Sequence, residues 1–264
     1  MFRSIPLLLF LALGTTLTPA AARPAVDPDA PTVILVHGAF ADASSWDQVA
    51  KRLRRRGVPV VAVDNPLSSL EADVDVTRAA IAAAPGKVVL VGHSWGGTVI
   101  TQAGVDPKVT ALVYVAAFAP DVGQTSAQQG EHFPVAPGLQ QLLERDGWLS
   151  LSPQTIARDF AQDLTPRALA RVQASQLPLK ASALAEPVTA AAWRSRPSWY
   201  VVSRKDRMLA PQLQVATAQR IGATLYSVGA SHVAPVSEPG EVSNVILEAS
   251  GLRPADAPTS AAGG

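Results

Sequence analysis

The chain has 264 residues, of which 48% are hydrophobic and 16% charged, and its 22 Lys and Arg balance 21 Asp and Glu. This apolar content can fill the core of a folded domain, and a net charge of +1 excludes the basic surface that nucleic acid or an anionic membrane would need. The absence of cysteine excludes disulfides and a cysteine nucleophile, and because the four histidines include no His-x-x-x-His pair, we expect no metal site.

The N-terminal residues have the pattern of an export signal. Arg3 supplies a positive charge, residues 5–13 form an apolar run, and Ala20 to Ala22 offer small residues for cleavage. The apolar run is too short to span a bilayer, so we expect no stable membrane anchor. The sequence therefore predicts a signal peptide over 1–22 and a secreted or periplasmic mature protein.

Strand and helix patterns alternate after this segment. Runs such as 33–36 and 88–91 are apolar throughout, which is typical of strands covered on both faces and hence of a parallel sheet. The chain therefore predicts an α/β fold with a doubly wound, mostly parallel sheet of about six strands. The predicted strands are 32–36, 58–63, 87–91, 109–117, 199–203 and 224–228, and the predicted helices between them are 45–56, 74–84, 98–103, 211–221 and 241–250.

The alternation stops over residues 121–196. This segment carries helical patterns at 139–145, 153–164, 166–176 and 188–194 and, as we interpret it, no strand. We expect a helical cap over the strand ends, although a second structural lobe away from any site is the alternative. The core would then comprise 23–120 and 197–251, followed by a disordered tail over 252–264 that is rich in Ala, Pro, Ser and Gly.

A G-x-S-x-G pattern, Gly92-His93-Ser94-Trp95-Gly96, lies between a predicted strand and a predicted helix. In this context the serine sits on a sharp turn that exposes its hydroxyl as a nucleophile, and glycine is needed where the turn approaches its neighbours. A glycine-rich turn with a capping serine is the structural alternative. We interpret Ser94 as the nucleophile.

A serine hydroxyl needs a base to take its proton. His232 follows the last predicted strand, at the same end of the sheet as Ser94, so it is the predicted base. His37 and His93 are expected to hold backbone groups, and His132 is expected to be an ordinary surface residue of the cap.

The base needs a carboxylate that orients its ring. Asp206 follows the strand 199–203 and completes the order Ser–Asp–His, whereas Asp121, after another strand, is a competitor. The oxyanion that forms on the substrate needs backbone N–H donors, which we assign to Trp95, next to the nucleophile, and to Ala39, in the loop after the first strand.

These motifs together resemble the α/β-hydrolase fold family, and in particular bacterial carboxylesterases related to plant methylesterases and hydroxynitrile lyases. The resemblance covers about residues 32–250. It implies a six-stranded core with a helical cap, no cofactor, and a small-molecule ester as substrate. The motifs that carry it are Val36-His37-Gly38-Ala39, Gly92-His93-Ser94-Trp95-Gly96-Gly97, Tyr114-Val115-Ala116-Ala117-Phe118-Ala119-Pro120-Asp121, Asp206 and His232.

The chain departs from the lyase branch at two positions. The lyases carry threonine where this chain has Gly38, and lysine after the catalytic histidine where it has Val233. Without that cation, cyanide has no electrostatic stabilisation. The expected function is therefore a carboxylesterase that cleaves small or medium esters, with lactone or thioester hydrolysis or cofactor-free perhydrolysis as alternatives on the same triad. A non-catalytic ligand-binding homologue is the alternative from another class of protein.

Overall fold

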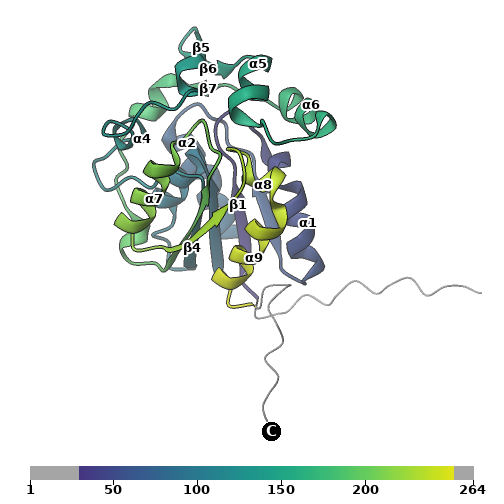
Figure 1. Ribbon diagram of the computed structural model, residues 1–264. Helices are drawn as coiled ribbons and strands as arrows, with labels where there is room; N and C mark the ends of the chain where they lie inside the picture. Colours follow the sequence, from purple (N-terminus) through teal and green to yellow (C-terminus); the bar gives the residue numbers. More distant parts are fainter. Residues whose placement is uncertain (1–29, 253–264) are drawn as a thin grey trace, which may run out of the picture.

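The computed structural model describes residues 30–252 (Figure 1). The predicted signal peptide over 1–22 and all but the first residue of the predicted tail over 252–264 lie outside the described residues. Within the described range, no helix combines the length and the apolar character that crossing a bilayer requires.

The core is one sheet of six parallel strands in the order β2-β1-β3-β4-β8-β9. Every residue of the neighbouring interior strands β1 and β3 is buried, as their apolar runs require. The predicted doubly wound sheet is confirmed. Its strands are β1 (Thr32–Val36), β2 (Val60–Val63), β3 (Val88–His93), β4 (Val109–Val115), β8 (Ser198–Ser203) and β9 (Thr224–Val228).

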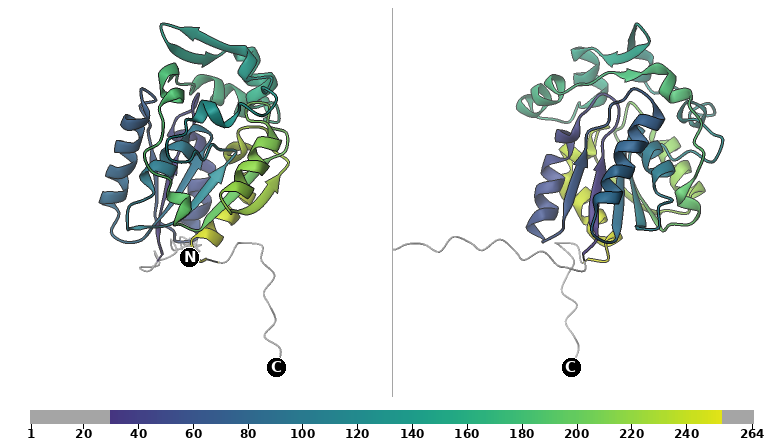
Figure 2. Two further views of the ribbon diagram at one scale, coloured as in Figure 1. Left: turned by 90° about the vertical axis from the view of Figure 1, so that its left-hand side faces the viewer. Right: turned by 180° about the vertical axis from the view of Figure 1, so that it is seen from behind.

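Helices cover both faces of this sheet (Figures 1 and 2). On one face α1 (Asp47–Arg55) and α9 (Pro239–Ala249) pack on Val89 and Val91 of β3. On the other face α2 (Leu70–Ala83), α3 (Trp95–Ala103) and α7 (Pro211–Arg220) share a core with Val88 and Leu90. Successive residues of β3 therefore pack into two separate cores, which explains why residues 88–91 are all apolar.

The parallel arrangement brings four chain segments to one edge of the sheet. Val36 pairs with Gly92, so the residues after β1 and β3 emerge side by side. Ser203 pairs with Val228, so the loops after β8 and β9 do the same. The segment between β4 and β8 lies over this edge, at the top of Figure 1.

The cap differs from the prediction of an all-helical segment. It contains α4 (Ser126–Gln129), α5 (Pro153–Thr155), a π-helical turn (Ile156–Phe160) and α6 (Pro166–Ala174). It also contains a three-stranded antiparallel sheet of β5 (Leu142–Arg145), β6 (Trp148–Leu151) and β7 (Leu179–Lys180). The expectation that this segment has no strand is wrong.

The physical reason is a tight hairpin. Asp146 and Gly147 have φ values of 53° and 75°, and an Asp-Gly pair in this left-handed conformation joins two antiparallel strands in a two-residue turn. The predicted helix over 139–145 is therefore wrong except for one 3₁₀ turn, Leu139–Gln141. The predicted helix over 188–194 is reduced to the 3₁₀ turn Ala192–Arg194.

Candidate active site

Ser94 occupies the turn between β3 and α3 in a strained conformation, with φ of 52° and ψ of −120°. Its N–H donates to the carbonyl of Val115 at 3.1 Å, and its own carbonyl accepts from the N–H of Gly97 at 3.0 Å and of Phe118 at 3.2 Å. These backbone bonds hold the residue on top of the turn, which leaves the side chain free to face a cavity.

The neighbouring glycines are required by close backbone contacts. A Cβ on Gly92 would lie 2.5 Å from the carbonyl oxygen of Gly96, and a Cβ on Gly96 would collide with the carbonyl of Val36. Gly38 is constrained in the same way, because a Cβ there would lie 2.7 Å from the Cβ of Ser94. The position where the lyases carry threonine therefore has no room for a side chain here.

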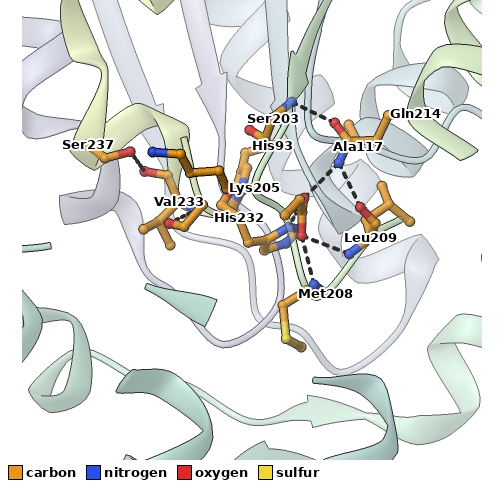
Figure 3. Close-up of polar contacts among 12 residues, drawn as sticks. His93, Ala117, Ser203, Lys205, Met208, Leu209, Gln214, His232, Val233 and Ser237 are labelled. Carbon is orange, nitrogen blue, oxygen red and sulfur yellow. Dashed lines mark hydrogen bonds and ion pairs between the residues drawn. The ribbon is translucent and has the colours of Figure 1, made fainter. Parts of the chain in front are cut away.

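The structure joins His232 to Asp206. Asp206 Oδ2 lies 2.7 Å from His232 Nδ1, so with its proton on Nδ1 the imidazole donates to the carboxylate. Asp206 Oδ1 accepts from the N–H groups of Met208 at 2.7 Å and Leu209 at 2.9 Å. Figure 3 draws these two hydrogen bonds and shows Met208 and Leu209 beside His232. The side chain of Asp206 is fully buried, and its hydrogen bonds offset the cost of burying the carboxylate.

Gln214, a residue that the sequence analysis did not single out, completes the surroundings of this carboxylate. Its Nε2 donates to Asp206 Oδ2 and to the carbonyl of Leu209, each at 2.8 Å, while its Oε1 accepts from Ser203 N–H at 2.9 Å (Figure 3). The side chain thereby links the end of β8 to the carboxylate. In the sequence Gln214 looks like any polar residue of helix α7, so no local signal could have identified it.

The other histidines have different surroundings. With its proton on Nε2, His93 donates to the carbonyl of His232 at 2.8 Å, and burial lowers the pKa of His93 to about 3. His37 Nδ1 lies 2.8 Å from the carbonyl of Gly38, and burial also lowers its pKa. Both hold backbone groups, as expected. His132 is exposed in the cap.

Asp121 forms a salt bridge with Arg194 instead of contacting a histidine. Its two carboxylate oxygens accept from Nε and Nη2 of Arg194 at 2.9 and 2.7 Å, and this hydrogen bonding lowers the pKa of Asp121. The structure therefore places Asp206, and not Asp121, against His232.

Ala39 and Trp95 line the same cavity as Ser94 and His232. The indole of Trp95 is 1% exposed, and its Nε1–H donates to Asp73 Oδ2 at 2.7 Å. Burial raises the pKa of Asp73 to about 6. Asp73 therefore anchors Trp95, the residue that follows Ser94, a role that its place in the first turn of α2 does not reveal.

The cavity above these residues, which we call the site cavity, has a volume of about 420 Å³. Its walls are aromatic and aliphatic side chains from the core and the cap, and Glu131 is the one carboxylate among the residues that line it. Such an apolar hollow with a few polar groups suits a small neutral ligand. The large apolar residues that line it are Phe40, Phe118, Phe133, Leu139, Leu142, Leu179, Leu184, Met208, Leu209 and Leu213.

Residues 30–252 contain no group of three His, Asp or Glu side chains placed to hold a metal ion. The chemistry that the site offers is that of a hydroxyl, an imidazole, a carboxylate and backbone N–H groups.

Comparison with known proteins identifies a family and individual relatives that this chain resembles. The model of the alpha/beta hydrolase family matches residues 33–245. A probable hydrolase, R7, of Phoma sp. is 26% identical over 84% of this chain and 99% of its own length. The esterase PIR7B of rice is 38% identical over 38% of this chain and 43% of its own. The crystal structure of polyneuridine aldehyde esterase matches with a TM-score of 0.73 at 22% identity, over 83% of this chain and 98% of that one.

Proposed function

Because the chain belongs to the alpha/beta hydrolase family and its relatives include esterases, we propose that it is a serine carboxylesterase that cleaves small or medium esters through an acyl-enzyme on Ser94. The observation that carries this proposal is that Ser94 and His232 face one cavity while Asp206 holds the far side of the His232 ring. That arrangement is what a serine needs to become a nucleophile.

The reaction begins with proton transfer. Asp206 keeps the His232 proton on Nδ1, so Nε2 is free to take the proton of the Ser94 hydroxyl as its oxygen attacks the ester carbonyl. The carbonyl oxygen becomes negative and accepts from the backbone N–H groups of Ala39 and Trp95. Each such donor contributes about 3–4 kcal/mol to stabilising the tetrahedral intermediate.

Collapse of this intermediate breaks the bond to the alkoxy oxygen, which takes the proton from His232 and leaves as the alcohol. A water molecule then gives a proton to Nε2 of His232 and attacks the acyl-enzyme. The second intermediate releases the carboxylic acid, and the proton returns to Ser94.

The site cavity supports a neutral substrate. No lysine or arginine is among its lining residues, so an anionic ester would lose its hydration without gaining a partner, while an apolar acyl group gains about 25 cal/mol per Å² of surface buried. Glu131 at the wall disfavours anions further.

Two positions favour ester cleavage over cyanohydrin cleavage. Gly38 has no room for the hydroxyl-bearing side chain of the lyases, and the residue after His232 is the buried, uncharged Val233. Lactone or thioester hydrolysis and perhydrolysis use the same residues, and a panel of such substrates ranks them against esters by kcat/KM.

The test of the proposal is a burst experiment. On mixing with p-nitrophenyl butyrate, the protein should release a burst of nitrophenolate stoichiometric with enzyme, because acylation of Ser94 by this activated ester is faster than hydrolysis of the acyl-enzyme. Ser94→Ala should show no burst and lose about 10⁶-fold in kcat while unfolding at the same temperature. A Ser94→Ala protein that retains a few per cent of the activity, or a wild type without turnover, would refute the proposal.

A further inference from the structure

A second cavity, of about 540 Å³, shares Phe40 with the site cavity, whereas Ser94 and His232 line the site cavity alone. It lies between α6 of the cap and the start of α1 in the core, and α8 (Ala234–Ser237) borders it. His93 and Val233, the neighbours of Ser94 and His232 in the sequence, also line it. The second cavity therefore adjoins the two loops that carry the nucleophile and the base.

Its walls differ in chemistry from those of the site cavity. Asp42, Ser45, Gln48 and Arg171 stand among apolar residues such as Val172, so the cavity offers hydrogen-bond donors and acceptors together. Two carboxylates, including that of Asp47, against one guanidinium disfavour an anion. A neutral group that both donates and accepts, such as a hydroxylated alcohol, fits these walls best.

Two aromatic rings separate the cavities. Phe40 lines both of them, and its ring meets the edge of Phe160 with the centroids 6.5 Å apart. Phe160 in turn lies against the imidazole of His232, with centroids 5.4 Å apart. The partition therefore stands directly beside the reacting groups.

Phe160 is held in place by its own segment. Asp159, which is fully buried, accepts from Arg207 Nε at 2.7 Å, and Asp163 accepts from the N–H of Ser231 at 2.7 Å. These bonds tie the π-helical turn and the residues after it to the loops of Asp206 and His232. A segment anchored on both sides of the ring leaves Phe160 little freedom to move.

Phe40 is the ring that both cavities share. It follows Ala39 in the sequence and has a φ of 61°, a left-handed conformation that is uncommon for a bulky residue and is found where function constrains the backbone. Since Phe40 lines both cavities, removing its ring is the change that would join them.

We propose that the second cavity is the subsite for the alcohol half of the ester, that it prefers a hydroxylated alcohol, and that Phe40 determines its access. This inference rests on the proposed esterase function. The two halves of an ester diverge at the carbonyl carbon, so an acyl group in the site cavity leaves the alkoxy group to be accommodated elsewhere. The second cavity adjoins the site cavity at Phe40, and Phe160 in its wall lies against the imidazole of His232, which protonates the departing group.

The test compares esters with one acyl group and different alcohols: methyl butyrate, 1-butyrylglycerol and pentyl butyrate. Ala168→Trp fills the second cavity from α6, and Ala216→Trp, on α7, is the matched control because Ala216 is equally half-buried and lines a different hollow. Ala168→Trp should lower kcat/KM for 1-butyrylglycerol at least about tenfold relative to methyl butyrate. Ala216→Trp should leave this ratio unchanged.

Phe40→Ala joins the cavities and should raise the ratio of kcat/KM for 1-butyrylglycerol over methyl butyrate at least about fivefold. An unchanged ratio in Ala168→Trp would overturn the subsite while the esterase function stands, because methyl butyrate is still hydrolysed. An equal loss for pentyl butyrate would overturn the preference for a hydroxylated alcohol. Absence of turnover of all three esters by the wild type would instead refute the esterase function.

Discussion

Replacing Asp206 with asparagine changes a carboxylate that takes part in four hydrogen bonds. Its Oδ1 accepts from Met208 and Leu209 N–H, and its Oδ2 contacts His232 Nδ1 and Gln214 Nε2. The asparagine oxygen satisfies the two backbone donors when it takes the place of Oδ1. Its NH₂ group then replaces Oδ2, so a donor faces both the imidazole and the amide of Gln214.

This exchange selects the wrong form of the imidazole. Against an NH₂ donor, Nδ1 of His232 must be the acceptor, so the proton moves to Nε2, which can no longer take the proton of Ser94. The same exchange in a Ser-His-Asp triad lowers kcat about 10⁴-fold, or about 5.5 kcal/mol at about 1.4 kcal/mol per tenfold. The NH₂ group of the new asparagine also faces the NH₂ group of Gln214, and these two donors without an acceptor between them lower the stability by a further ~1–3 kcal/mol.

The assay measures kcat with p-nitrophenyl butyrate for the wild type and for Asp206→Asn and Asp121→Asn, with thermal unfolding of each protein as the check of the fold. Asp121 pairs with Arg194 and its side chain is 33% exposed, so Asp121→Asn should lower kcat less than about threefold. A loss below about 100-fold in Asp206→Asn, or a larger loss in Asp121→Asn, would refute the reasoning.

We expect kcat/KM for p-nitrophenyl esters to peak at roughly two to six acyl carbons, because the cap closes the site cavity and each methylene gains about 0.8 kcal/mol only while it fits; a rise up to palmitoyl esters would show an open groove. Burial raises the pKa of Asp73 from 3.8 to about 6, so its contribution to stability is present below pH 3.8 and is lost as the pH rises through about 6. Denaturant titrations should therefore show the wild type losing stability relative to Asp73→Asn between those pH values, and a constant difference would contradict this. N-terminal sequencing of protein recovered outside the cytoplasm should begin near Arg23, and a chain still starting at Met1 would argue for an anchor. Activity should survive EDTA; loss to the chelator with recovery on adding zinc would contradict a metal-free mechanism.

The sheet and the turn that presents Ser94 could be predicted because their signals are local. An apolar run such as 88–91 can only be a strand covered on both faces once its length and its flanking glycines are considered. Gly92 and Gly96 are required by contacts with the backbone of the adjoining turn and strand, so the G-x-S-x-G spacing carries the geometry of the turn with it.

The cap was predicted poorly because its segments are short. Over four residues such as 142–145, an apolar pattern fits a helix and a strand equally well. The pair Asp146-Gly147, which is typical of a two-residue hairpin turn, is the feature that decides between them. The π-helical turn that carries Phe160 and the residues after it are held by bonds to Arg207 and Ser231, and no local sequence pattern reveals these contacts.

The sequence by itself determined the fold, the turn that presents Ser94, and a short set of partners for it. Chain order left both Asp206 and Asp121 at strand ends, and only the tertiary structure places Asp206 on His232. The reason is that this contact depends on the pairing of β8 with β9, which brings the loop after Ser203 beside the loop after Val228. Local sequence patterns act over a few residues, whereas a site assembled from loops far apart in the chain is decided by the register of the sheet that carries them.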